Sequence, residues 1–147
     1  MTSPELKFCY KYPRAAFTVD AIIVASDHCE DMILLILRKY NPYAGKWALP
    51  GGFFEMDETL EDACKRELFE ETGVKNVTLH QFFTFDAINR DPRDRTITTV
   101  FHGRMPEPIP VTGGDDAATA RWFPIISLPE MAFDHAEILR KFVKEKI

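Results

Sequence analysis

The sequence predicts an α/β fold in which helices cover both faces of a mixed β-sheet. Apolar, β-branched runs typical of strands recur along the chain, one amphipathic segment lies near the middle, and a second lies at the end. Mixed strands with a central and a terminal helix favour an α/β/α sandwich, because each helix buries its apolar face against one side of the sheet. The length of 147 residues fits a single domain spanning residues 1–147.

The expected strands are, in chain order, residues 17–25, 32–38, 77–87, 96–104 and 120–124. The first two form a hairpin across a polar turn, and the next two pair across a charged turn. A loop marked by Asn41-Pro42 and Gly45 precedes the segment 47–49. Residues 105–116 carry three prolines and two glycines and are expected to be a loop.

Two helices are expected. The central helix begins at about Glu58, with Asp57 as a candidate N-cap, and ends before Gly73, which is placed to terminate it in a left-handed conformation. The last helix runs from Asp134 onwards, capped by Asp134 itself or by Ser127 further upstream.

Composition excludes several classes of protein. The net charge of −5 argues against a general nucleic-acid binder, which normally carries a basic patch. The longest apolar run, residues 32–37, is too short to cross a membrane, and the start of the chain lacks a secretory signal pattern. The three cysteines show neither zinc spacing nor a disulfide framework, so a reducing cytoplasm is the expected location.

The end of the central helix carries Glu67, Glu70 and Glu71, which share one face at helical spacing. Three carboxylates this close repel each other unless a cation lies between them, and Mg²⁺ binds such oxygen ligands together with substrate phosphates. A solvated, Glu-rich surface helix is the alternative. Glu67 argues against it, because Glu67 extends the apolar stripe of Leu60, Ala63 and Cys64 and would be desolvated there.

The same stretch resembles the signature of the Nudix hydrolase family. That signature is Gly, five residues, Glu, seven residues, Arg-Glu, an aliphatic residue, any residue, Glu-Glu, any residue, Gly and an aliphatic residue. Every specified position is filled, by Gly52, Glu58, Arg66, Glu67, Leu68, Glu70, Glu71, Gly73 and Val74. The resemblance implies a Nudix-type sandwich and hydrolysis of a nucleoside diphosphate derivative with Mg²⁺ or Mn²⁺.

The metal ligands that this resemblance implies are Gly51 (through its carbonyl), Glu67, Glu70 and Glu71. Glu70 is alternatively the base, and Arg66 and Glu58 orient the carboxylates. Asp116, or its neighbour Asp115, is a further candidate base; the alternative for both is a Gly-Gly-Asp turn.

Segments outside the signature resemble the bacterial ADP-ribose pyrophosphatase branch and the Nudix domain of related repressors. They are residues 45–52, 90–95, 113–123 and 132–138. In the second of these, Arg90, Arg93 and Arg95 suit a diphosphate, a terminal phosphate or a base, since guanidinium forks match phosphate oxygens. The alternative is an exposed hairpin in which they pair with Asp91 and Asp94.

Two further substrate candidates carry structural alternatives. Trp47 either stacks on a base or belongs to the core, and His135 either contacts ligand or is structural.

The first expectation is therefore a Mg²⁺-dependent hydrolase that converts ADP-ribose to AMP and ribose 5-phosphate. The alternatives are a sanitising hydrolase of damaged nucleoside triphosphates and a non-catalytic ADP-ribose-sensing domain of a repressor. The intact signature, and a chain that ends after the last helix, favour the enzyme. The aromatic N-terminal stretch of Phe8, Tyr10, Tyr12 and Phe17 predicts a homodimer.

Overall fold

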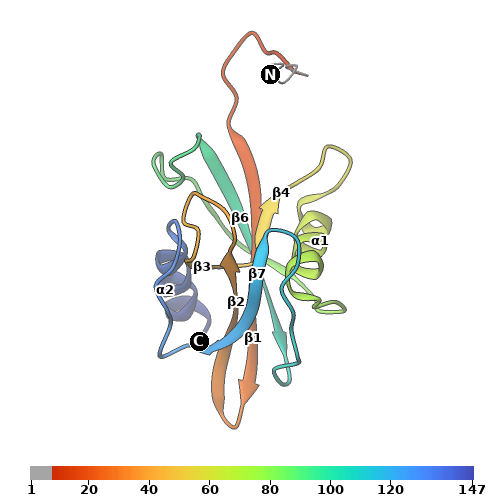
Figure 1. Cartoon of the computed structure of the whole chain (residues 1–147), viewed down its shortest axis with the longest axis vertical. Coiled ribbons are helices and arrows are strands. Elements are labelled where there is room, and N and C mark those ends of the chain that lie inside the picture. The colour runs from red at the N-terminus through yellow and green to blue at the C-terminus, as the bar shows by residue number, and fades with distance from the viewer. Residues whose placement is uncertain (1–7) are drawn as a thin grey trace.

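The computed structural model describes residues 8–147. Residues 1–7, part of the segment in which no secretory signal pattern is expected, lie outside the described residues. Figure 1 shows helix α1 (Leu60–Thr72) and helix α2 (His135–Lys146) on opposite sides of one sheet. The expected α/β architecture is confirmed.

The sheet has seven strands, of which β1 (Ala16–Asp27) is central. It pairs antiparallel with β2 (Glu30–Arg38) as the predicted hairpin and parallel with β6 (Thr96–Met105), so the sheet is mixed. The other strands are β3 (Trp47–Ala48) and β7 (Ala117–Pro124) on β2, β4 (Gly51–Phe53) on β1, and β5 (His80–Phe85) on β6.

Alternation along β1 divides the core into two layers. Val19, Ala21 and Ile23 face one cluster with the apolar residues of α1, and Ile22 and Val24 face a second cluster with those of α2. The alternation follows from the two-residue side-chain period of a strand. Because both faces are buried, β1 reads as a nearly continuous apolar run with Asp20 as its buried acidic exception.

The predicted helix boundaries need two corrections. Helix α1 begins at Leu60, and its N-cap is Thr59, whose hydroxyl accepts a hydrogen bond from the Asp62 N–H at 3.1 Å, so Asp57 is not the cap. Asp134 is the N-cap residue of α2, but its side chain makes no capping bond, because the carboxylate is taken by Arg90. Gly73 ends α1 in the predicted left-handed conformation, with φ of 79°.

The segment before β1 carries exposed aromatic side chains. Figure 1 shows this part of the chain running beyond the end of the sheet. Phe8, Tyr10 and Tyr12 of this segment, and Phe17 at the start of β1, are between 45% and 70% exposed. Among the described residues, no helix is long and apolar enough to span a membrane.

Candidate active site

A cavity of about 330 Å³ lies where α1, the strands β1, β2 and β4, the loop of residues 90–95 and the start of α2 meet. Its acidic lining residues include Asp20, Glu55, Glu67, Glu71, Asp91 and Asp116, and its arginines are Arg38, Arg66, Arg90 and Arg93. Charges of both signs therefore line one cavity. Such a space suits a ligand that carries its own anionic groups and, with them, a cation.

Glu71 is the most desolvated carboxylate of α1. It is only 2% exposed, and one oxygen, Oε1, accepts a hydrogen bond from the Gly51 N–H at 2.8 Å. Burial raises the pKa of Glu71 to about 8, an effect that the hydrogen bond from Gly51 only partly opposes. Burial also raises the pKa of Glu67. Both carboxylates would be stabilised by a cation placed between them.

Arg66 organises the other carboxylates of the helix. Its guanidinium lies 2.6 Å from Glu58, 3.0 Å from Glu67 and 3.2 Å from Glu70, and it also donates to the Phe53 carbonyl. These hydrogen bonds, those to Glu58 first, raise the pKa of Arg66. Arg66 and Glu58 are thus placed to orient carboxylates. Glu58, Glu67, Glu70 and Glu71 are called the carboxylate cluster below.

The glycine pair before α1 has a specific packing role at Gly52. A Cβ at this position would lie 2.7 Å from the Cδ and Oε1 atoms of Glu67. Only a residue without a side chain lets β4 approach the Glu67 carboxylate this closely. The absence of a side chain at Gly52 therefore makes room for the carboxylate of Glu67.

The donor set fits a hard divalent cation. Carboxylate and carbonyl oxygens are the ligands that Mg²⁺ and Mn²⁺ take in proteins, and burial raises the pKa of Glu67 and Glu71 because their ionised forms lose solvation that a bound cation would replace. Within residues 8–147, no three His, Cys, Asp or Glu side chains already converge on one point. Asp116 also lines the cavity, and it is one of the charges that raise the pKa of Glu71.

A buried polar network at the floor of the cavity joins the predicted His135 to Asp20 and Thr98, which sequence reasoning missed. Thr98 donates to Asp20 at 2.5 Å, and His135 Nε2 lies 3.7 Å from the other Asp20 oxygen. The backbone N–H of Leu49 donates to His135 Nδ1 at 3.0 Å, which places the imidazole proton on Nε2. Burial raises the pKa of Asp20 to about 7 and lowers that of His135 to about 3. The signal available in the sequence was Asp20, a single acidic residue inside the apolar run of β1.

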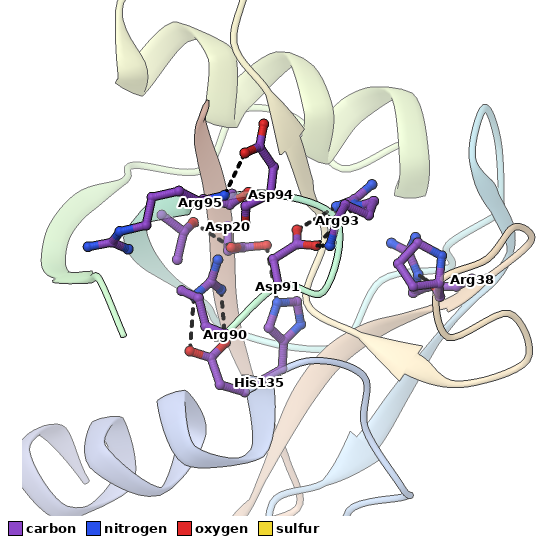
Figure 2. Close-up of polar contacts among 12 residues, drawn as sticks. Asp20, Arg38, Arg90, Asp91, Arg93, Asp94, Arg95 and His135 are labelled. Carbon is purple, nitrogen blue, oxygen red and sulfur yellow. Dashed lines mark hydrogen bonds and ion pairs between the residues drawn. The ribbon is translucent and has the colours of Figure 1, made fainter. Parts of the chain in front are cut away.

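The arginines of the 90–95 loop are held by carboxylates. Arg90 makes two hydrogen bonds to Asp134, at 3.0 and 2.8 Å, and Arg93 makes two to Asp91, at 3.1 and 2.8 Å (Figure 2). Only the pair of Arg93 with Asp91 matches the alternative of an exposed hairpin, because Arg90 is buried and pairs with Asp134; both arginines line the cavity. Arg95 does not line it, and Figure 2 shows its guanidinium pointing away from Arg93.

The cavity brings together most of the predicted site residues. Its lining includes Gly51, Arg66, Glu67, Glu71, Arg90, Arg93, Asp116 and His135. Glu58 and Glu70 do not line the cavity, but both form ion pairs with Arg66, which does. Trp47 lies elsewhere, packed edge-on against Phe123 with ring centroids 4.7 Å apart in the core beside α2. Arg38 and Phe133 line the cavity as well and carried no pattern in the sequence that singled them out.

Comparison with known proteins agrees with the signature. The NUDIX domain model matches residues 15–144. The ADP-ribose pyrophosphatase of Methanocaldococcus jannaschii is 39% identical over 97% of this chain and 81% of its own length. An ADPR responsive transcriptional repressor of Acinetobacter baylyi is 31% identical over 88% of the chain, which spans 54% of that repressor.

Solved structures show the same likeness. The NUDIX domain of Shewanella oneidensis NrtR complexed with ADP ribose has a TM-score of 0.87 at 26% identity, covering 96% of this chain and 95% of that one. A bifunctional NMN adenylyltransferase/ADP ribose pyrophosphatase of Francisella tularensis, complexed with AMP and a manganese ion, has a TM-score of 0.79 at 32% identity, covering 92% and 43%. On its sequence, its fold and the geometry of its cavity, the chain belongs to the Nudix hydrolase family.

Proposed function

We propose that this protein hydrolyses ADP-ribose to AMP and ribose 5-phosphate. One observation carries the proposal: a single cavity joins the desolvated carboxylates Glu67 and Glu71 to the arginines Arg90 and Arg93. A diphosphate with its bound metal ion is complementary to such a lining, since it offers a cation to the carboxylates and anionic oxygens to the guanidiniums. The full-length similarity to a protein named ADP-ribose pyrophosphatase supports the choice of substrate.

The metal ligands in this proposal are the Gly51 carbonyl, Glu67, Glu70 and Glu71, and Mg²⁺ or Mn²⁺ bound there would neutralise the diphosphate and lower the pKa of the attacking water. Arg66 keeps Glu67 and Glu70 oriented through its ion pairs, and Glu58 holds Arg66 in turn. Hydrolysis breaks one phosphorus–oxygen bond of the diphosphate bridge, with the water oxygen added to one phosphorus and a proton passed to the departing phosphate.

Two acidic residues are candidates for the base that takes the proton of water. Glu70 is held by Arg66 at 3.2 Å and is the more exposed member of the carboxylate cluster. Asp116 lines the cavity from the strained loop that contains Asp115, whose φ is 52°. Substitution of each in turn by the isosteric amide distinguishes them, because loss of the base removes the ascending limb of the pH–rate profile.

On the substrate side, Arg90, Arg93 and His135 line the cavity, and Arg95 and Trp47 remain candidates that lie outside the lining. The ion pairs of Arg90 and Arg93 fix both guanidiniums before a ligand arrives, which lowers the entropic cost of binding. Arg90 is almost completely buried and paired with Asp134, so besides facing the cavity it positions the start of α2 next to the ligand.

Two other functions are separated from this one by experiment. The likeness to the ADPR responsive repressor favours a sensing domain as the second candidate. A sensor would bind ADP-ribose without turnover. The intact signature supports catalysis, since every carboxylate of the cluster is present. A sanitising hydrolase would instead prefer a nucleoside triphosphate.

The decisive test is a substrate screen with Mg²⁺ and with Mn²⁺, in which phosphate is released from the product by an added phosphatase. We expect ADP-ribose to exceed ATP, dGTP and oxidised dGTP in kcat/KM by at least about tenfold, which needs only about 1.4 kcal/mol of discrimination. A chelator is expected to abolish activity and added metal to restore it. A better triphosphate substrate, or ADP-ribose binding without turnover, would contradict the proposal.

We also propose that the chain is one domain that forms a homodimer in a reducing, cytoplasmic compartment. The exposed aromatic residues before β1 support the dimer, because a cluster of this kind usually marks an interface. The three free cysteines support the compartment. Light scattering at micromolar concentration is expected to exceed the monomer mass of 16.9 kDa, and a value near that mass would contradict the dimer.

A further inference from the structure

Two histidines lie side by side on neighbouring strands, outside the active-site cavity. His80 begins β5, and His102 on β6 is directly opposite it in the antiparallel pairing of the two strands. The centroids of their rings are 5.6 Å apart, and the ring planes are tilted by 42°, so the rings are not stacked face to face. Neither residue lines the cavity, so the proposed hydrolysis leaves this pair without a role.

The other two of the chain's four histidines have different surroundings. His135 is buried, and its Nδ1 accepts a hydrogen bond from the Leu49 N–H, so it is not available to an ion from solvent. His28 lies in the exposed turn between β1 and β2, with its Nε2 3.5 Å from the Asp27 carboxylate. His28 is therefore accessible, but it does not face a second histidine across a strand pair.

One ring of the pair is held in place and the other is free to turn. The ring of His102 packs against that of Phe142 on α2, with centroids 5.4 Å apart, and against that of Phe82, with centroids 6.4 Å apart. His80 is exposed, on the strand that forms one edge of the sheet. Its imidazole can rotate about the side-chain torsions. A nitrogen of each ring can therefore be brought to one point by movement of His80 alone.

The separation of the two rings is close to that of two imidazoles on one metal ion. Directly opposed residues of antiparallel strands have Cβ atoms about 4.5–5.5 Å apart, which keeps both side chains within reach of a common ligand. Imidazole nitrogen binds Zn²⁺ at about 2.0–2.1 Å, so two rings on one tetrahedral ion have centroids about 5 to 5.5 Å apart. The distance of 5.6 Å between His80 and His102 needs only a small rotation to reach that range.

The charges around the pair act in opposite directions. Burial lowers the pKa of His102, and the positive charges of Lys146 and His80 lower it further, so the imidazole of His102 is neutral at pH 7. Neutral imidazole is the form that binds Zn²⁺ and other divalent transition metals. Lys146, at the end of α2, also repels a cation bound at His102, so its removal should strengthen the binding.

We propose that His80 and His102 form a transition-metal site, in which the two imidazoles bind one Zn²⁺ ion and water fills the remaining positions. The protein supplies two ligands, since within residues 8–147 no group of three His, Cys, Asp or Glu side chains is arranged to hold a metal. The ion would cross-link the edge strand β5 to β6 and stabilise the folded state, in which alone the two rings are neighbours. Mg²⁺ prefers oxygen ligands, so this site is independent of the carboxylate cluster.

The test follows the imidazole signals of the histidines by nuclear magnetic resonance while Zn²⁺ is added to the full chain, without a histidine tag and in excess Mg²⁺. We expect the signals of His80 and His102 to shift together. In His80→Gln the affinity read from the His102 signal should fall by at least about tenfold, because even the loss of a residue that only supports a ligand costs that much. Lys146→Gln should raise the affinity by about two- to threefold, the range for one exposed charge.

His28→Gln is the matched control. It removes an exposed histidine whose neighbour Cys29 is also exposed, so this turn is the competing place for the same ion. We expect the affinity read from His80 and His102 to stay within about twofold of wild type, since the turn does not belong to the pair. Thermal unfolding without Zn²⁺ checks that His80→Gln is folded, and with Zn²⁺ it should show a smaller rise in Tm for this variant than for wild type.

The possible results decide the assignment without reference to hydrolysis. Signals of His80 and His102 that do not respond to Zn²⁺ in wild type would overturn it, as would an unchanged affinity in a folded His80→Gln variant, or equal losses in His80→Gln and His28→Gln. Hydrolysis of ADP-ribose should be the same in His80→Gln and wild type. If wild type binds Zn²⁺ through the pair but does not hydrolyse ADP-ribose, the proposed function is wrong and the metal site stands.

Discussion

The carboxylate cluster and the arginines that face the same cavity are built in different ways. Glu58, Glu67, Glu70 and Glu71 come from one short segment, and helix geometry alone places the last three on one face of α1. Apart from Arg66, which lies on α1, the arginines come from the end of β2 and from the loop before β6, and their partners include a residue at the start of α2. One group is local in the sequence and the other is assembled by the fold.

This difference determines how each group tolerates change. A local group keeps its geometry as long as its helix forms, so substitutions there act on chemistry. A group assembled from distant elements depends on packing, and its ion pairs are as much structural as functional. Buried pairs such as Arg90 with Asp134 are costly to break, because the remaining charge is left without a partner.

The largest expected effect is in the carboxylate cluster. Glu71→Gln removes a charge that is 2% exposed and proposed to hold metal, and we expect kcat to fall by about a thousandfold, the range for losing a group that stabilises charge in the transition state. Steady-state kinetics with Mg²⁺ measures it. Glu61→Gln, on the exposed side of the same helix, is the control and should be neutral. Near-normal turnover of Glu71→Gln would remove Glu71 from the metal site.

Gly52→Ala tests whether the backbone supports the cluster. The new Cβ would meet the Glu67 carboxylate at 2.7 Å, and displacing a candidate ligand should weaken Mn²⁺ binding by about ten- to a hundredfold. Calorimetry with Mn²⁺ measures it. Gly103→Ala makes a comparable clash with Thr78 far from the cavity, so it should lower stability without changing Mn²⁺ affinity. Equal Mn²⁺ affinities in the two variants would argue against the role of Gly52.

Asp20→Asn tests the buried acid at the base of the cavity, which the carboxylate cluster and the arginines share. The pKa of Asp20 is raised from 3.8 to about 7, so the folded state keeps a proton that the unfolded state loses, and stability falls as pH rises from about 4 to 7. The gain in unfolding free energy of Asp20→Asn over wild type should therefore be larger at pH 8 than at pH 5, by about 2 kcal/mol.

Chemical denaturation in the presence of a chelator measures this gain. Because each variant is compared with wild type at the same pH, the titration of His135, whose pKa lies at about 3, cancels from the difference. An Asp20→Asn gain that is equal at the two pH values would show that Asp20 is not buried as a protonated acid.

The smallest expected effect lies in the 90–95 loop. Arg93→Gln should raise KM for ADP-ribose by about tenfold with less change in kcat, as expected for a contact made equally in ground and transition states. Arg95→Gln is the matched variant in the same loop, and its effect on KM should be smaller, because Arg95 does not line the cavity. A larger effect from Arg95 than from Arg93 would reverse this ranking.

The sequence by itself was enough for the architecture, the hairpin, the left-handed Gly73 and the carboxylate cluster. These features depend on short-range rules: the periods of strand and helix, the conformational freedom of glycine, and a spacing that places Glu67, Glu70 and Glu71 on one face. The start of α1 was misplaced by two residues, because several polar residues before it compete for the cap and Thr59 is the one whose hydroxyl reaches the helix backbone.

The tertiary structure alone decided which polar side chains meet the cluster. It placed Asp20 under the cavity, bound Arg38 to the Pro42 carbonyl, turned Arg95 away and packed the partly buried Trp47 against the core. None of these outcomes follows from spacing along the chain, because each depends on strands and loops that are distant in sequence and become neighbours only when the sheet closes around β1. Burial then determines the charge state and the partner of each group, and burial is a property of the folded molecule.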